Sequence, residues 1–138
     1  EMTRTALRHP LTMIASDGRI LEGKGHPRST GSFSKVLGKF VREEQLIPLM
    51  DALRRMTIEP AKRLEAFVPA MANKGRIRVG ADADITVFDP GSILDQATYV
   101  DPIRPSVGIE YVIVNGGVVL DDGVLDPTVR EGVAIRSN

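Results

Sequence analysis

The hydrophobic period of this sequence changes from that of a helix to that of a strand near Lys74. Before this residue, apolar side chains recur with the spacing that marks one face of an amphipathic helix. After it, β-branched and aromatic residues form short runs separated by turn residues, as they do in strands. With 138 residues, the chain is long enough to bury a core. The pattern predicts an α+β chain whose helices come first and whose small antiparallel sheet comes second.

Three helices are predicted in the first half. The first shows its apolar face at Phe33, Val36, Leu37, Phe40 and Val41. The second begins near Pro48, a residue suited to a first turn, and ends at Thr57, with Arg55 expected on its outer face. The third is short: Thr57 caps it, Ala61 and Leu64 are expected to face inward, and Pro69 closes the helical half.

The strongest turn signal lies at Asn115-Gly116, between the apolar runs 109–114 and 118–120. Both turn positions need a positive φ, which these residues adopt readily, so a type I′ or bulged hairpin is predicted. Another strand is predicted over 84–89, and its β-branched and aromatic content favours burial on both faces. Asp122-Gly123 supplies a second turn.

Two more strands are predicted nearer the ends of the chain. Residues 133–135 have the composition of a last strand of the sheet. The apolar run at 14–16 predicts an opening strand that ends in Asp17-Gly18. Residues 95–105 are expected to be irregular, because prolines within them discourage regular structure.

The charge balance excludes several classes of partner. The chain carries 18 basic and 18 acidic residues, so its net charge favours neither nucleic acid nor an anionic membrane.

The chain has no cysteine, which excludes disulfides and thiolate metal sites and fits a reducing compartment. No apolar run is long enough to span a bilayer, and the first residues lack the pattern of a signal peptide. We therefore expect a cytoplasmic protein with neither nucleic acid nor membrane as a partner.

Asp17 is the first candidate site residue, because an apolar run ends there in a carboxylate on a tight turn. Taken alone, an Asp-Gly pair in this position is an ordinary turn whose carboxylate binds backbone amides. Arg28 alone is likewise an ordinary solvated arginine of a loop. His26 is expected to bind backbone atoms of its loop, since no second metal ligand stands at a suitable spacing from it. Asp82 and Asp84 are interpreted as turn and strand residues.

Short motifs follow one another along the chain: Ser16-Asp17-Gly18, Gly25-His26-Pro27-Arg28, Val36-Leu37-Gly38, Met56-Thr57, Gly75-Arg76-Ile77, Gly80-Ala81-Asp82-Ala83-Asp84-Ile85 and Val112-Ile113-Val114-Asn115-Gly116. In this order they resemble the C-terminal part of the N-acyl-D-amino-acid deacylases, which belong to the amidohydrolase superfamily. The glycine-alanine-aspartate and valine-asparagine-glycine motifs are typical of many amidohydrolases. The histidine-proline-arginine motif is narrower and indicates the D-aminoacylase branch.

The resemblance implies a fold. Residues 1–72 would form the last strand and following helices of a metal-dependent (β/α)8 barrel, and residues 73–138 a small antiparallel β-sandwich portion. In the family, the eighth strand ends in an aspartate that contacts the metal and handles the proton of the attacking water. Asp17 matches this position and is the predicted catalytic and metal-binding residue. Bound zinc suits this chemistry, because it lowers the pKa of a water molecule to about 7.

The resemblance also implies a role for Arg28. The matching arginine of the family binds the α-carboxylate of the acylated D-amino acid, a task that suits a planar guanidinium. This sequence departs from the family nearby, with Thr30 where a tyrosine is common and Ser34-Lys35 where a proline-arginine pair is common. These departures concern the shape of the pocket and its side-chain preference.

The other metal ligands of the family have no counterpart here. Its histidine-x-histidine pair, its bridging cysteine or modified lysine, and its later histidines all precede the matching region, and an intact barrel takes about 250 residues. We expect the C-terminal portion of a metal-dependent amidohydrolase acting on a small amide substrate. The isolated chain is expected to be inactive, to bind no stoichiometric zinc, and to self-associate or pair with the missing N-terminal part. Two alternatives stay open: a non-catalytic interaction module, and one half of a split amidohydrolase.

Overall fold

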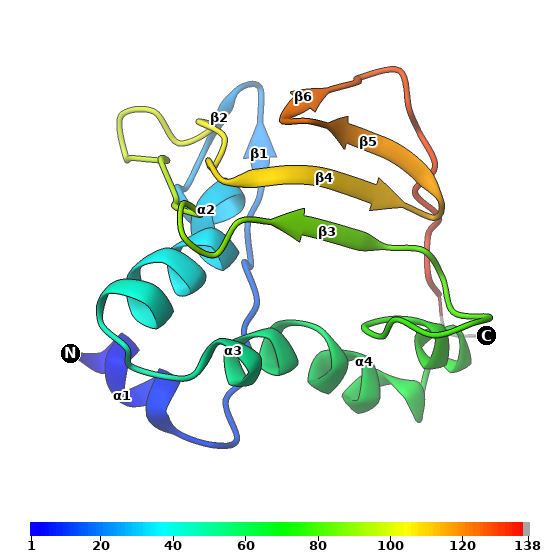
Figure 1. The fold of residues 1–138 in the computed structure, drawn as a ribbon, viewed down its shortest axis with the longest axis horizontal. Coiled ribbons are helices and arrows are strands. Elements are labelled where there is room, and N and C mark those ends of the chain that lie inside the picture. The colour runs from blue at the N-terminus through cyan, green and yellow to red at the C-terminus, as the bar shows by residue number, and fades with distance from the viewer. Residues whose placement is uncertain (137–138) are drawn as a thin grey trace. The chain divides into compact units, whose positions relative to one another are not determined.

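The computed structural model describes residues 1–136 (Figure 1). These residues form two compact units. The first unit contains residues 1–56 and 89–108, and the second contains 57–88 and the residues from 109 onward. Within residues 1–136, no helix combines the length and apolar character that crossing a membrane requires.

The first unit is mainly helical. Its elements are α1 (Met2–Arg8), β1 (Ile20–Leu21), β2 (Lys24–Gly25), α2 (Arg28–Lys35), the π-helix η1 (Val36–Glu43) and α3 (Leu49–Met56). Helix α2 runs directly into η1, so the predicted helix around residues 33–41 is confirmed and is longer than its apolar face suggested. The Glu44 N–H donates to the Lys39 carbonyl at 2.9 Å, the i→i+5 spacing of a π-helix.

The core of the first unit forms around η1. Val36, Leu37 and Phe40 are buried on its inner face, as the predicted apolar pattern requires. Gly38 lies against the segment 89–108, because a Cβ at this position would come within 2.5 Å of the Ile93 carbonyl oxygen. Ile93 is itself buried. The segment 89–108 is therefore part of this core, although it lies between two strands of the second unit in sequence.

The predicted opening strand over 14–17 is wrong for this chain. Residues 12–19 form neither helix nor strand. A strand needs a neighbouring strand to receive its hydrogen bonds, whereas the N–H of the buried Ile14 donates to the Arg55 carbonyl at 3.0 Å. The antiparallel pairing that follows is the short β1–β2 hairpin, which the sequence analysis did not predict.

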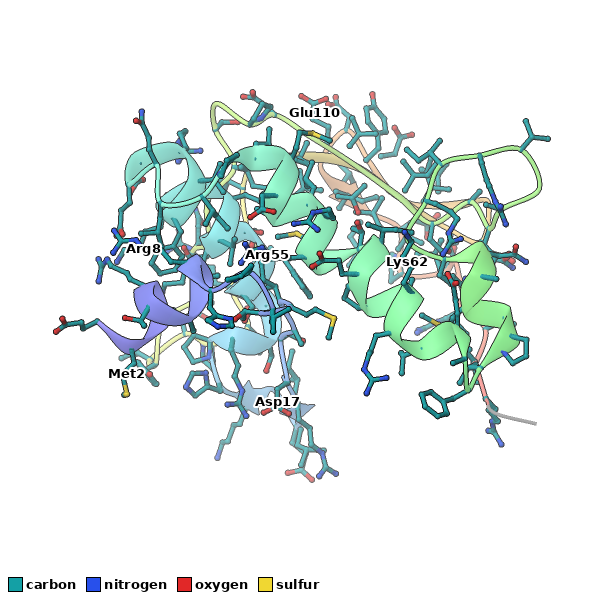
Figure 2. The ribbon with its side chains drawn as sticks, turned by 90° about the horizontal axis from the view of Figure 1, so that it is seen from below. Met2, Arg8, Asp17, Arg55, Lys62 and Glu110 are labelled. Carbon is teal, nitrogen blue, oxygen red and sulfur yellow. The ribbon has the colours of Figure 1, made fainter. Side chains whose placement is uncertain are left out.

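The prediction that Arg55 lies on an outer face of its helix is wrong. It is 4% exposed, and Figure 2 shows it reaching from α3 towards α1. Its Nη1 donates to the Leu7 carbonyl at 2.8 Å and to the His9 carbonyl at 2.9 Å, while its Nη2 lies 2.6 Å from the Asp51 carboxylate. The helical period put Arg55 on the outer stripe, because nothing in the local sequence showed that these carbonyls require a donor.

The second unit joins two short helices to an antiparallel sheet (Figure 1). Its elements are α4 (Ile58–Glu65), the 3₁₀ helix η2 (Pro69–Asn73), β3 (Ile85–Phe88), β4 (Ile109–Val114), β5 (Gly117–Asp121) and β6 (Val124–Leu125). The strand order is β3-β4-β5-β6, and every neighbouring pair is antiparallel. The predicted antiparallel sheet is confirmed.

Both predicted turns of the sheet are confirmed. Asn115 and Gly116 join β4 to β5 with φ values of 48° and 88°. Asp122 and Gly123 join β5 to β6 with φ values of 47° and 76°. These left-handed angles are the ones that a type I′ turn requires at both central residues.

Several finer predictions for the second unit are wrong. The predicted last strand, 133–135, is irregular, since those residues have no ladder partner. Strand β3 is not buried on both faces, because Val87 is 40% exposed. Leu64 is 45% exposed, so of the two residues expected to face inward only Ala61 is buried. Pro69 begins η2 instead of closing the helical part, since proline suits a first helical position.

Candidate active site

Asp17 and Arg28, the two candidate site residues of the sequence, lie in contact. The Nη2 atom of Arg28 is 3.0 Å from the Oδ2 atom of Asp17. Asp17 belongs to the irregular loop before β1, and Arg28 is the first residue of α2. Their side chains are 86% and 49% exposed, and Figure 2 shows Asp17 at an outer edge of the molecule. The structure therefore brings an acid and a guanidinium together on an open surface.

The backbone around Asp17 explains this contact. Asp17 has a φ of 46°, a left-handed conformation that aspartate tolerates better than most residues. At Gly18 the chain passes close to α2, since a Cβ there would lie 2.4 Å from the Ser29 Cα. The Ser29 hydroxyl donates to the Arg19 carbonyl at 3.2 Å and holds the two segments together. Glycine at position 18 thus permits the approach that places Asp17 beside Arg28.

His26 binds backbone, as predicted. Its Nδ1 atom accepts the Arg28 N–H at 3.1 Å, and its carbonyl accepts the Ser29 N–H at 2.9 Å. These two bonds satisfy amides of the first turn of α2, which have no partner inside the helix. His26 therefore supports the backbone at Arg28.

The residues that the structure describes hold no complete metal site. Among residues 1–136, no group of three or more histidine, cysteine, aspartate or glutamate side chains lies close enough together to hold a metal ion. The charged neighbour of Asp17 is the cationic Arg28, which is not a metal ligand. Structural and catalytic zinc sites need at least three protein ligands. Around Asp17, the described residues therefore do not fit a metal centre on their own.

Asp82 and Asp84 form a structural cluster with Lys74 in the second unit. The Lys74 Nζ atom lies 2.8 Å from Asp82 and 2.5 Å from Asp84. The Asn115 N–H also donates to Asp84, at 2.7 Å. The hydrogen bond from Lys74, followed by the one from Asn115, holds the pKa of Asp84 below its usual range. These carboxylates fasten the start of β3 to the hairpin turn.

The positions that depart from the family contact the segment after Asp89. The Thr30 hydroxyl donates to the Pro102 carbonyl at 2.9 Å, and the Thr30 carbonyl accepts from the Ser106 hydroxyl at 3.2 Å. The Lys35 Nζ atom lies 3.4 Å from the Asp95 carboxylate. Sequence reasoning did not identify this segment as part of the surroundings of Arg28, because its prolines indicated only irregular structure.

The sequence and the fold of this chain match those of a known protein family. The chain belongs to the amidohydrolase family, which matches residues 1–120. Within the family it is similar to deacylases of N-acylated D-amino acids, so the predicted resemblance is confirmed. It is 41% identical over 133 residues to the N-acyl-D-glutamate deacylase of Alcaligenes xylosoxydans xylosoxydans, covering 96% of this chain and 26% of that enzyme. It is 40% identical over 108 residues to the D-aminoacylase of the same organism, covering 78% of this chain and 21% of the relative.

Solved structures agree with this assignment. A crystal structure of D-aminoacylase matches 94% of this chain with a TM-score of 0.82 and 35% identity, over 26% of the solved chain. The N-acyl-D-glutamate deacylase of Bordetella bronchiseptica, solved with zinc and a phosphonate inhibitor, matches 97% with a TM-score of 0.80 and 40% identity, over 27% of the solved chain. The chain thus spans about a quarter of the length of the relatives that it matches.

Proposed function

We propose that this chain is the C-terminal portion of a metal-dependent amidohydrolase that cleaves the amide bond of N-acyl-D-amino acids. The observation that carries the proposal is the 3.0 Å contact between Asp17 and Arg28. An acid and a guanidinium side by side suit a substrate that has both a scissile amide and a free carboxylate. The similarity to deacylases of N-acyl-D-glutamate and N-acyl-D-aspartate supports the same substrate class.

Asp17 has the proton-transfer role in this proposal. Its carboxylate takes a proton from the attacking water as a general base. It then delivers this proton to the leaving amine as a general acid. Its exposure leaves it open to an incoming substrate.

Arg28 has the binding role. A guanidinium makes two parallel hydrogen bonds to a carboxylate, so Arg28 suits the α-carboxylate of the substrate. Before substrate binds, Arg28 pairs with Asp17. An incoming α-carboxylate replaces Asp17 as the partner of the guanidinium and leaves the Asp17 carboxylate free for proton transfer.

Zinc, or another divalent metal, belongs to the intact enzyme in this proposal. This chain contributes Asp17 as one ligand, and residues outside it contribute the others. Residues 1–72 then complete a (β/α)8 barrel, and residues 73–138 belong to a small β-sandwich domain. The isolated chain accordingly binds no stoichiometric zinc, has no deacylase activity, and self-associates or pairs with an N-terminal part.

One observation favours a second candidate function. Several large apolar side chains are exposed, among them Leu11, Ile77, Val79 and Val100. Each of these side chains would be stabilised by burial against another chain. They fit a non-catalytic interaction module, and equally one half of a split amidohydrolase. In either case the chain binds a second polypeptide, but only the split enzyme gains hydrolytic activity from it.

A chimeric enzyme tests the proposed function. This chain replaces the matching quarter of the Alcaligenes N-acyl-D-glutamate deacylase, hereafter the chimera. We expect the chimera to bind zinc and to hydrolyse an N-acyl-D-amino acid, and the isolated chain to do neither. A folded, zinc-loaded chimera without hydrolysis would contradict the proposal, as would hydrolysis by the isolated chain.

A further inference from the structure

The segment 95–106 is fastened against the first turn of α2 at several points. The Pro102 carbonyl accepts from the Thr30 hydroxyl, and the Ser106 hydroxyl donates to the Thr30 carbonyl. A further contact is aromatic: the ring centroids of His26 and Tyr99 lie 5.1 Å apart, with the ring planes at 84°. This is the edge-to-face arrangement that aromatic rings prefer. Both segments line a hollow of about 370 Å³ beside Arg28.

The His26 ring has one orientation that serves Arg28. Its Nδ1 atom accepts the Arg28 N–H, so the neutral ring carries its proton on Nε2. The bond also requires a ring plane in which Nδ1 faces the Arg28 N–H. The edge-to-face contact with Tyr99 disfavours tilting of that plane. Tyr99 thereby stabilises the ring plane in which His26 holds the Arg28 backbone.

We propose that His26 and Tyr99 are positioning residues for Arg28. His26 fixes the backbone at the first residue of α2, and Tyr99 fixes the His26 ring. Together they determine the position of the Arg28 backbone, from which the side chain extends to Asp17. The functional importance of this support rests on the proposed function, in which Arg28 binds the substrate carboxylate. The support itself is a property of this chain.

Exposure separates this role from a contribution to the core. Tyr99 is 82% exposed, and His26 lies at the surface. Removing either side chain therefore leaves the packing around η1 unchanged. Asparagine at position 26 offers a matched replacement, because its side-chain oxygen also accepts the N–H two residues further on. Phenylalanine at position 99 keeps the ring and loses only the hydroxyl.

Hydrogen exchange in the 138-residue chain tests the proposal, with four variants: His26→Ala, His26→Asn, Tyr99→Ala and Tyr99→Phe. We expect His26→Ala to speed exchange of the Arg28 amide by about tenfold, the size of one hydrogen bond, and His26→Asn to restore the slow rate. Tyr99→Ala should speed it by about twofold, because its contact is weaker and exposed, and Tyr99→Phe should leave it unchanged. The Ala52 amide, which donates to the Pro48 carbonyl, reports any global unfolding.

The second measurement, made on the same samples, is the NMR chemical shift of the Arg28 side chain. The Arg28 Nε chemical shift in an Asp17→Asn chain defines the unpaired guanidinium. We expect His26→Ala and Tyr99→Ala to move the wild-type shift towards that value, and the two conservative variants to leave it in place. An unchanged Arg28 amide rate and Nε shift in His26→Ala would overturn the proposal, as would a rise in the Ala52 rate equal to that of Arg28. No turnover is measured, so failure of this proposal would not be a failure of the proposed function.

Discussion

The guanidinium of Arg28 lies 3.0 Å from the carboxylate of Asp17, and the side chain of Arg28 is half exposed while that of Asp17 is largely open to solvent. An ion pair as exposed as this one contributes little to stability. Exchanging Asp17 for another carboxylate at Arg28 therefore costs the protein little. The proposed role of the pair is therefore to receive a charged ligand and not to hold the fold together.

Substitution of Arg28 tests its binding role. In the chimera, Arg28→Ala should raise the KM for an N-acyl-D-amino acid by about 10- to 100-fold, because a charge-assisted hydrogen-bonding partner is lost. Arg28→Lys should give an intermediate KM, since lysine keeps the charge without the fork of donors. Steady-state kinetics with substrates that do or do not carry an α-carboxylate measures the effect. Arg19→Ala serves as the control. A fall in kcat with an unchanged KM would show that Arg28 does not bind the carboxylate.

Substitution of Gly18 tests the geometry of the pair. Gly18→Ala places a Cβ 2.4 Å from the Ser29 Cα, so the loop must move away from α2. We expect the free energy of unfolding of the chain to fall by about 1–3 kcal/mol, the usual cost of overpacking, and Asp17 to separate from Arg28. Urea denaturation and the Arg28 Nε shift measure the two effects. Gly132→Ala is a suitable control, because its nearest neighbour would be 4.0 Å away. Equal unfolding free energies in the two variants would contradict this packing.

Arg55 should be more important for stability than its neighbour Arg54. Arg55→Ala leaves the Leu7 and His9 carbonyls and the Asp51 carboxylate without their shared donor. The expected loss in the free energy of unfolding is about 2–4 kcal/mol, because buried polar groups without partners are costly. Arg54→Ala, at a half-exposed position, should cost less than about 1 kcal/mol. Urea denaturation of both variants measures the difference, and similar losses would contradict the burial of Arg55.

The Lys74 cluster makes a prediction about pH. Folding lowers the pKa of Asp84, so its contribution to stability is present above its unfolded pKa of about 3.9 and is lost as the pH falls through the folded value. Lys74→Met removes the main cause of that shift. We expect the variant to be less stable than wild type at pH 7, and the difference to shrink in strong acid.

Urea midpoints at both pH values and carboxyl NMR of Asp84 test this prediction. The Asp84 pKa should rise in Lys74→Met, and Lys24→Met provides a control at an exposed position of β2. A stability difference that persists unchanged in strong acid would mean that Lys74 acts by packing and not through its charge.

Local chemistry was predictable from the sequence wherever it decides the structure by itself. Asn115-Gly116 and Asp122-Gly123 specify their turns because few other residues adopt their positive φ angles. The apolar stripe around Phe40 indicated the buried face of its helix, because the helical period by itself places these side chains on one side. The His26 interaction was also predictable, since it involves residues of the same loop.

Features that depend on distant partners were not predictable. The burial of Arg55 follows from carbonyls more than forty positions away in the chain. The apolar run at 14–16 has the composition of a strand, but strands form only where another strand can accept their hydrogen bonds. Tyr99 gave no signal at all, because its importance comes from the ring of His26 in a different segment.

The most direct test of the account is the turnover number of the chimera carrying Asp17→Asn. Asparagine keeps the size and the left-handed backbone of position 17 but cannot take a proton, so kcat should fall by about 10²- to 10⁴-fold while KM changes by less than about threefold. Asp122→Asn is a matched control, since Asp122 has a φ of 47° beside the 46° of Asp17, and it should leave kcat unchanged. A kcat in Asp17→Asn equal to that of the Asp122→Asn control would contradict the assignment of Asp17 as the catalytic acid.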